Sequence, residues 1–192
     1  MKKIIGFIAG ALIFAVPLFA DVIGDKSSVP QGAVTVVDNF ERGNYWIWAA
    51  FDWEFFGPAK LSTSARVTNQ WASEGRNSLE CGMTSATPDS DRDGMYYMDY
   101  HWDFSGAKYL VFDVQNPFSS TFYIYAALQT TDSWNWHATS EIAVAPGTHT
   151  VVLDITDAAA ELFLVRRINL CYKEGENALK GYFFIDNLRI IK

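Results

Sequence analysis

Apolar and polar residues alternate in short runs along most of the chain, from residue 34 to residue 190. Turn signals such as Asn116-Pro117 and Pro146-Gly147 separate these runs, and only residues 157–164 fit a helix, of about two turns. About ten short strands without alternating helices predict an all-β fold, a sandwich or jelly roll. The predicted strands are residues 34–37, 61–67, 78–83, 96–100, 109–114, 122–128, 141–144, 148–155, 167–172 and 182–190.

The same alternation predicts which side chains point away from the core, because successive residues of a strand face opposite sides. In residues 109–115, 121–129 and 168–173, the polar and tyrosine side chains stand opposite the apolar ones. Flat rings beside short hydrogen-bonding groups are typical of sugar-binding surfaces, and an ordinary solvated sheet face is the alternative interpretation. We expect one sheet face to carry Tyr123, Tyr125, Gln129, Asp113, Gln115, Asn169 and Lys173.

Residues 1–20 have the order of a secretory signal peptide. Lys2 and Lys3 form a positive start, an apolar run follows, and the small residue Ala20 ends it. A transmembrane anchor is the alternative, which Pro17 near the end of the run opposes. We expect cleavage after Ala20, export to the periplasm or the cell exterior, a flexible lead-in over residues 21–32 and one domain over residues 33–192.

Charge, aromatic content and cysteines narrow the function further. The chain has 15 basic and 22 acidic residues, a formal net charge of −7, which argues against a nucleic-acid or anionic-membrane partner and suits a neutral one. Aromatic residues make up 16% of the chain, so some Trp and Tyr side chains are expected at the surface. Cys81 and Cys171 are predicted to point to opposite faces of strands, which disfavours a disulfide but leaves their pairing open.

Three segments in order carry a resemblance to a known family. They are residues 37–44 (VDNFERGN), residues 103–114 (DFSGAKYLVFDV) and residues 182–188 (YFFIDNL). Together they look like the galactose-binding-like jelly-roll family of carbohydrate-binding modules, whose members open on an acidic strand and close on an Ile-Asp-Asn-Ile strand. The resemblance spans residues 34–190 and implies a single-domain jelly-roll β-sandwich that binds a polysaccharide or another glycan.

The resemblance also implies a structural Ca²⁺ ion near the first and last strands. Its ligands would be Glu41 and Asp186, with Asp38 as a candidate third, since Ca²⁺ takes carboxylate oxygens. The alternative is that Asp186 and Asn187 satisfy backbone groups at a strand bend, where a switch of apolar parity predicts a β-bulge.

A second acidic run resembles the opening of a calcium loop. Its twelfth position is Tyr100 where such a loop carries a bidentate Glu, so a solvated turn fits it as well. The residues concerned are Asp89, Asp91 and Asp93.

The candidate ligand-binding side chains combine rings with hydrogen-bonding groups. Trp134 and Trp136 follow a turn signal at the end of the strand that carries the outward tyrosines, so we expect them at the rim of the same sheet. A second aromatic cluster, within residues 45–56, is expected to be largely buried over one end of the sandwich. The predicted ligand-binding set is Tyr123, Tyr125, Trp134, Trp136, Asp113, Gln115 and Gln129.

The usual enzyme signatures are absent from the sequence. The three histidines lack metal-ligand spacing, and no nucleophile elbow or phosphate-binding glycine loop occurs. We therefore predict a secreted, non-catalytic carbohydrate-binding protein. A structural protein of the cell envelope or an extracellular assembly is the competing hypothesis, and a glycoside-active enzyme using Glu80 or Glu141 is a third.

Overall fold

The structure is a computed structural model that describes residues 20–42, 48–50, 62–84, 94–175, 177 and 179–192. The predicted signal segment before Ala20, the acidic run at residues 89–93 and most of the aromatic cluster at residues 45–56 lie outside the described residues. Within the described part, no helix is long and apolar enough to cross a lipid bilayer.

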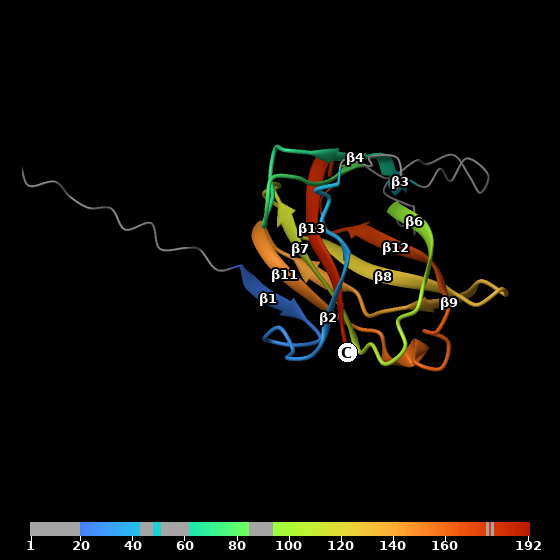
Figure 1. The fold of residues 1–192 in the computed structure, drawn as a ribbon. Coiled ribbons are helices and arrows are strands. Elements are labelled where there is room, and N and C mark those ends of the chain that lie inside the picture. Colours follow the sequence, from blue (N-terminus) through green and yellow to red (C-terminus); the bar gives the residue numbers. More distant parts are fainter. Residues whose placement is uncertain (1–19, 43–47, 51–61, 85–93, 176, 178) are drawn as a thin grey trace, which may run out of the picture.

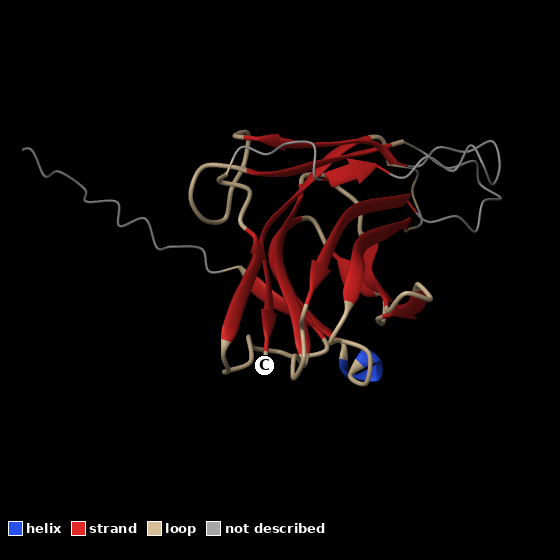
Figure 2. Ribbon diagram, turned by 45° about the vertical axis from the view of Figure 1, so that its right-hand side comes forward, coloured by secondary structure: helices blue, strands red, loops and turns tan. Residues whose placement is uncertain are grey.

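The strands form two sheets packed face to face (Figures 1 and 2). Sheet A has the order β1-β11-β7-β13-β5-β4, and β2 also pairs with β13. Its strands are β1 (Asp21–Gly24), β2 (Val34–Asp38), β4 (Ser62–Thr68), β5 (Ser78–Met83), β7 (Tyr109–Asn116), β11 (Gly147–Asp154) and β13 (Gly181–Ile191).

Sheet B has the order β10-β8-β12-β6-β3, and β9 also pairs with β8. Its strands are β3 (Trp48–Ala50), β6 (Gly94–Trp102), β8 (Phe122–Thr130), β9 (Asn135–Ala138), β10 (Ile142–Val144) and β12 (Val165–Glu174). All ten predicted strands are therefore present, and the predicted all-β sandwich is confirmed. The helical prediction for residues 157–164 was wrong in type, because only a short 3-10 helix, η2 (Thr156–Ala158), forms there before a series of turns.

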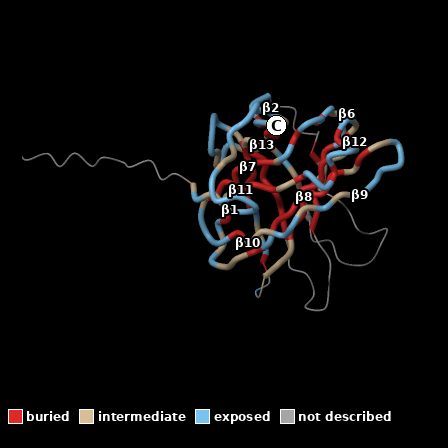
Figure 3. The backbone as a smooth tube through the Cα atoms, turned by 90° about the horizontal axis from the view of Figure 1, so that it is seen from below, coloured by how far each residue is buried: buried red, intermediate tan, exposed pale blue. Residues whose placement is uncertain are grey.

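Alternate residues of both sheets build the core between them, which Figure 3 shows as the buried interior. Phe122, Phe183 and Tyr172 pack with their rings 4.9–5.8 Å apart at its centre. Tyr96 is also fully buried, and its hydroxyl donates to the Gly82 carbonyl at 2.6 Å. This bond satisfies the one polar atom that the ring brings into the core, so an aromatic interior is compatible with stability.

The first four residues of the segment expected to be a flexible lead-in, Asp21–Gly24, belong to sheet A. Strand β1 pairs with β11 in parallel, the Asp25 amide donates to the Val152 carbonyl at 2.8 Å, and the Asp154 amide donates to Asp25 Oδ2 at 2.6 Å. Val22 and Val29 pack onto an apolar cluster on the outer face of the sheet, formed by Val111, Val152 and Ile191. The prediction failed because so short a strand, followed by Ser, Pro and Gly, carries little periodicity.

The two cysteines lie in different sheets. Cys81 on β5 belongs to the main core, whereas Cys171 on β12 belongs to a separate cluster on the outer face of sheet B. Both cysteines are buried, and they do not form a disulfide with each other. Cys81 faces the core between the sheets, whereas Cys171 faces outward from sheet B. The predicted difference in direction is therefore present, although the parity argument considered both strands in one sheet.

Candidate functional site

The outer face of sheet A is covered by the β4–β5 loop, residues 69–77. Trp71 packs on Phe184 with ring centroids 6.3 Å apart, and the Gln70 side chain donates to Glu80 at 3.1 Å. Beneath this loop the side chains of Glu80 and Asp186 are completely buried. The loop therefore covers this face, and residues 69–77 are called the roof loop below.

Two neighbouring carboxyl groups, Asp113 on β7 and Asp186 on β13, hold the roof loop from below. Asp186 accepts the backbone N–H groups of Ser73 at 2.8 Å and Glu74 at 3.0 Å. Asp113 accepts the hydroxyls of Ser73 and Thr150, each at 2.7 Å. Burial raises the pKa of Asp186 above its usual value of 3.8, against the lowering effect of its hydrogen bonds.

Asp113 and Gln115 were predicted to bind ligand beside Tyr123, and the structure corrects that prediction. Both lie on β7 in sheet A, whereas Tyr123 lies on β8 in sheet B. Asp113 is buried under the roof loop, and Gln115 is partly buried opposite Phe184 and Thr148. The parity of each strand was interpreted correctly, but parity does not say which strands share a sheet.

The predicted β-bulge at Asp186-Asn187 is confirmed by a register shift between Asp186 and Arg189 and by the φ of +53° at Asn187. The bulge turns the Asp186 carboxylate toward N–H groups, since the Asn187 amide also donates to it at 2.7 Å. This geometry agrees with the alternative that the sequence left open, in which Asp186 satisfies backbone groups at a strand bend.

The three residues implied as calcium ligands each accept N–H donors. Asp38 accepts the Trp48 indole N–H at 2.9 Å and the Phe40 amide at 2.8 Å. Glu41 accepts the amides of Arg76 and Asn77, each at 2.7 Å, and these bonds lower its pKa. Among the described residues no group of three metal-ligating side chains comes together. Because N–H dipoles directed at a carboxylate take the place of a cation, these residues do not fit a calcium site.

The outer face of sheet B is built differently. Tyr125 packs with Met95 and Cys171 in a separate buried cluster and is only 8% exposed, so it is not available for stacking on a ligand. Tyr123, two residues earlier on β8, is 39% exposed. The prediction for Tyr125 was therefore wrong, because alternation separates the core side from the outer side but does not report what covers the outer side.

The β8–β9 hairpin presents the two predicted tryptophans. Trp134 and Trp136 are 37% and 47% exposed, and Trp136 stands opposite Gln129 in the register of β9 with β8. Trp134 has a φ of +56°, in the left-handed region that is unfavourable for a large side chain. Strained residues of this kind cluster at binding sites.

Glu161 fixes the base of this hairpin. Its carboxylate accepts the Thr130 hydroxyl at 2.5 Å, the Asn135 amide group at 3.0 Å and a bond with His137 at 2.8 Å. These hydrogen bonds lower the pKa of Glu161 to about 2. Asn135 and His137 are thereby held on the inner side of β9, which leaves Trp136 on the outer side.

Two consecutive arginines on β12 support the Trp134 ring. The guanidinium of Arg166 lies 4.7 Å from the ring centroid, and that of Arg167 lies 5.3 Å from it and 4.2 Å from the Tyr97 ring. Arg167 is held by Asp99 through two bonds, of 2.5 Å and 2.8 Å. A register shift between Val165 and Arg167 interrupts the alternation there, which is how both guanidinium groups reach one ring.

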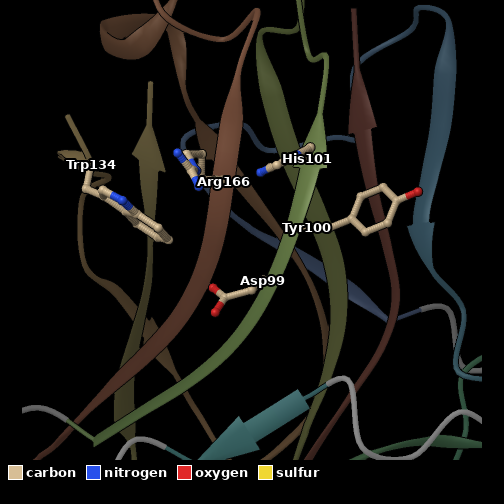
Figure 4. Close-up of a pocket in the computed structure, with 5 residues that line it drawn as sticks. All are labelled: Asp99, Tyr100, His101, Trp134 and Arg166. Atoms are coloured by element: carbon tan, nitrogen blue, oxygen red, sulfur yellow. The ribbon is translucent and has the colours of Figure 1, made fainter. Parts of the chain in front are cut away.

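A groove of about 530 Å³ lies beside this ring, between the hairpin and the end of β6. Figure 4 shows Asp99 and His101 directed toward the side where Trp134 and Arg166 lie, whereas Tyr100 points the other way. The groove thus combines an aromatic ring with a carboxylate, an imidazole and a guanidinium. Its lining residues are Asp99, Tyr100, His101, Trp134 and Arg166.

Sequence reasoning missed most of this groove. Asp99, Tyr100, His101 and Arg166 were not among the predicted ligand-binding residues, and of the predicted set only Trp134 lines it. The sequence did contain a signal for these residues, because the alternation of apolar and polar residues is lost in two segments. These are Asp99-Tyr100-His101-Trp102 and Arg166-Arg167.

Glu80 and Glu141, the carboxylates considered for catalysis, lie apart. Glu80 is buried in sheet A and binds Arg66 at 2.6 Å, whereas Glu141 precedes β10 in sheet B and pairs with Lys173. They do not face one another across a cleft, so the pairing that glycoside hydrolysis requires is not formed by these two residues.

Comparison with known proteins identifies the fold. No family model and no curated protein matches the sequence. Among solved structures, a family 28 carbohydrate-binding module specific for non-crystalline cellulose has 15% identity and a TM-score of 0.61, over 92% of this chain and 100% of that one. The family 11 module from Clostridium thermocellum, in complex with a β-1,3-1,4-mixed-linked tetrasaccharide, has 15% identity and a TM-score of 0.60 over 84% and 97%.

A third similar structure is the first family 27 module of Caldicellulosiruptor saccharolyticus, in complex with mannohexaose. It has 15% identity and a TM-score of 0.57, over 84% of this chain and 98% of that one. These similarities, together with the two-sheet topology, show that the chain has the jelly-roll sandwich fold of carbohydrate-binding modules, as the sequence motifs indicated.

Proposed function

We propose that this protein is a secreted, non-catalytic glycan-binding protein that holds a polysaccharide on the outer face of sheet B. The observation that carries the proposal is the exposure of Trp134 and Trp136 on a hairpin fixed from below, next to a groove lined by hydrogen-bonding groups. A sugar ring can stack its C–H groups on an indole while its hydroxyls bond to Asp99 and His101. The solved modules of similar fold, two of them bound to oligosaccharides, support this class of ligand.

Binding rather than catalysis is the activity that the groove supports. Among its described lining residues the groove has one carboxylate, Asp99, which accepts both bonds from Arg167, whereas glycoside hydrolysis requires a pair of carboxyl groups. Shallow, reversible binding through one or two indole rings follows from this geometry. The secreted location rests on the signal-like sequence of residues 1–20.

The experiment is affinity electrophoresis of the purified protein through gels that contain soluble β-glucan, galactomannan, xylan or an acidic polysaccharide. Trp134→Ala and Trp136→Ala are compared with the wild type. We expect at least one polysaccharide to retard the wild type and each substitution to reduce its affinity, by about tenfold for a stacking indole.

Tyr182→Ala is the matched control, since Tyr182 is an aromatic residue of similar exposure, 46%, on sheet A. It is expected to leave retardation unchanged. Failure of every polysaccharide to retard the wild type would refute the proposed function and favour the competing role in an assembly. Equal retardation of wild type and both tryptophan variants would refute the proposed site alone.

A further inference from the structure

Arg166 and Arg167 both lie near the Trp134 indole but are bound in different ways. Arg167 is locked by Asp99 through a fork of two bonds, and its side chain is only 19% exposed. Arg166 is 25% exposed, and among the described residues it makes one hydrogen bond, from Nη1 to Asp132 at 2.7 Å, while its Nε is buried without a partner. The Asp132 side chain is 89% exposed. A forked pair holds its geometry, whereas a single pair with so exposed a carboxylate contributes little and exchanges readily with solvent.

The exchangeable arginine is the one that lines the groove. Arg166 shares the groove with Trp134 and His101, while the negative charge of Asp99 is already paired with Arg167. A ligand carboxylate that replaced Asp132 on Arg166 would therefore leave the number of paired charges unchanged. It would also lie beside the ring on which a sugar stacks, because the guanidinium is 4.7 Å from the Trp134 centroid.

We propose that the groove selects glycans that carry carboxylates, that is, polysaccharides built from uronic acids. The uronate ring stacks on Trp134 and its carboxylate takes the place of Asp132 on Arg166. This inference rests on the proposed function and names its ligand class. The chain as a whole has a formal charge of −7, but charges farther away than about 8 Å are largely screened at physiological salt, so the local groups decide.

The experiment compares polysaccharides that differ only in charge. Polygalacturonate is paired with its methyl ester, and alginate with its propylene glycol ester, in affinity electrophoresis at fixed ionic strength. We expect the wild type to bind at least one acid form about tenfold more tightly than the matching ester, the effect of one charge-assisted hydrogen bond. Added sodium chloride should reduce binding of that acid form and leave ester binding unchanged.

Three variants assign the effect to the groove. Arg166→Gln is expected to bring acid binding down to the level of the ester. Asp132→Asn removes the competing carboxylate and is expected to strengthen acid binding by severalfold. Arg76→Gln is the matched control, because it removes the same charge from an exposed position on the roof loop of sheet A and should change neither affinity.

The outcomes separate this inference from the proposed function. If the protein binds neutral polysaccharides through Trp134 and shows no preference for either acid form, the acidic-ligand inference is wrong and the proposed function stands. If no polysaccharide of any kind is bound, both fail. A preference for an acid form that survives Arg166→Gln would also overturn the assignment, since the selective group would then lie elsewhere.

Discussion

The two outer faces of the sandwich carry similar kinds of side chain but are used in opposite ways. The face of sheet A is covered by the molecule itself, by residues 69–77 at one end and by the segment containing Val22 and Val29 at the other. On sheet B, Tyr123, Trp134 and Trp136 remain exposed, and Trp134 lines a groove. What distinguishes a structural face from a candidate binding face is therefore the covering segments, and not the composition of the strands.

The carboxyl groups of the two faces show the same contrast. Asp113 and Asp186 on sheet A use their oxygens to hold backbone and hydroxyl groups of the same chain. Next to sheet B, Glu161 in the turn before β12 fixes the hairpin that carries Trp134, and Asp99 on β6 holds Arg167 against the Trp134 ring. Substitutions on the two faces should consequently separate stability from binding.

The largest effect is expected for Asp186→Ala. Removing this buried acceptor leaves the N–H groups of Ser73 and Glu74 without partners under the roof loop, which should lower the free energy of unfolding by about 3 kcal/mol. The measurement is urea denaturation at pH 7. Glycan affinity of the folded fraction should be unchanged, and a loss of affinity at full folding would contradict the division between the two faces.

A second prediction uses pH, because the two faces should respond in opposite directions. The pKa of Asp186 is raised, so the proton-linked part of its contribution to stability is complete below 3.8 and is lost as pH rises through the folded-state value, while its bonds to the Ser73 and Glu74 amides remain. The pKa of Glu161 is lowered to about 2, so its contribution is complete above 4.5 and is lost as pH falls toward 2.

The measurement is the free energy of unfolding against pH for the wild type, Asp186→Asn and Glu161→Gln. Each substitution should remove the part of the pH dependence that its own carboxyl group causes. Tryptophan fluorescence of the wild type should change with the Glu161 titration on the acid side, and Glu161→Gln should abolish that change, since Glu161 fixes the hairpin of Trp134 and Trp136. Variants with identical pH profiles would show that neither carboxyl titrates as its surroundings indicate.

A smaller effect is expected for Arg167→Lys. Lysine keeps the charge but loses the planar fork that binds Asp99 and stacks between Tyr97 and Trp134. Glycan affinity should fall about fivefold, the value of one cation–π contact, with little change in stability. Near-ultraviolet circular dichroism should change together with affinity, and an unchanged Trp134 signal would show that Arg167 does not position the ring.

The smallest effect concerns calcium. Glu41→Gln should lower the melting temperature, because it weakens acceptance of the Arg76 and Asn77 amides. This decrease should be the same in millimolar calcium and in chelator, since Glu41 does not fit as a metal ligand. A decrease in melting temperature seen only in calcium would support the calcium site that the sequence motifs implied.

Much of the fold could be predicted from sequence, because each strand of the core alternates clearly. Phe122, Ile124 and Leu128 point inward as expected, and the parity switch near Asp186 marks a real bulge. Strands β1, β3 and β9 were missed, since three or four residues seldom establish a period. The order of strands in each sheet depends on contacts distant in sequence, which no local pattern records.

The candidate site was harder to predict for the same reason. Trp134 and Trp136 were identified from a turn signal, which is local, and both are exposed. Arg166 and Asp99 reach Trp134 from two other strands through bulges and register, so only the assembled sheet brings them together. Tyr125 was mistaken for a surface ring because its covering is a tertiary feature.

The central position of β13 in sheet A has a consequence for how the chain folds. This strand comes last in sequence, yet β7 and β5 pair with it on either side and β2 joins its C-terminal half (Figure 1). A chain that emerges N-terminus first has no centre for sheet A until residue 191 is available. Pairing between such distant segments is slow. On the proposed export route, the polypeptide would therefore stay unfolded enough for translocation until β13 has been synthesised.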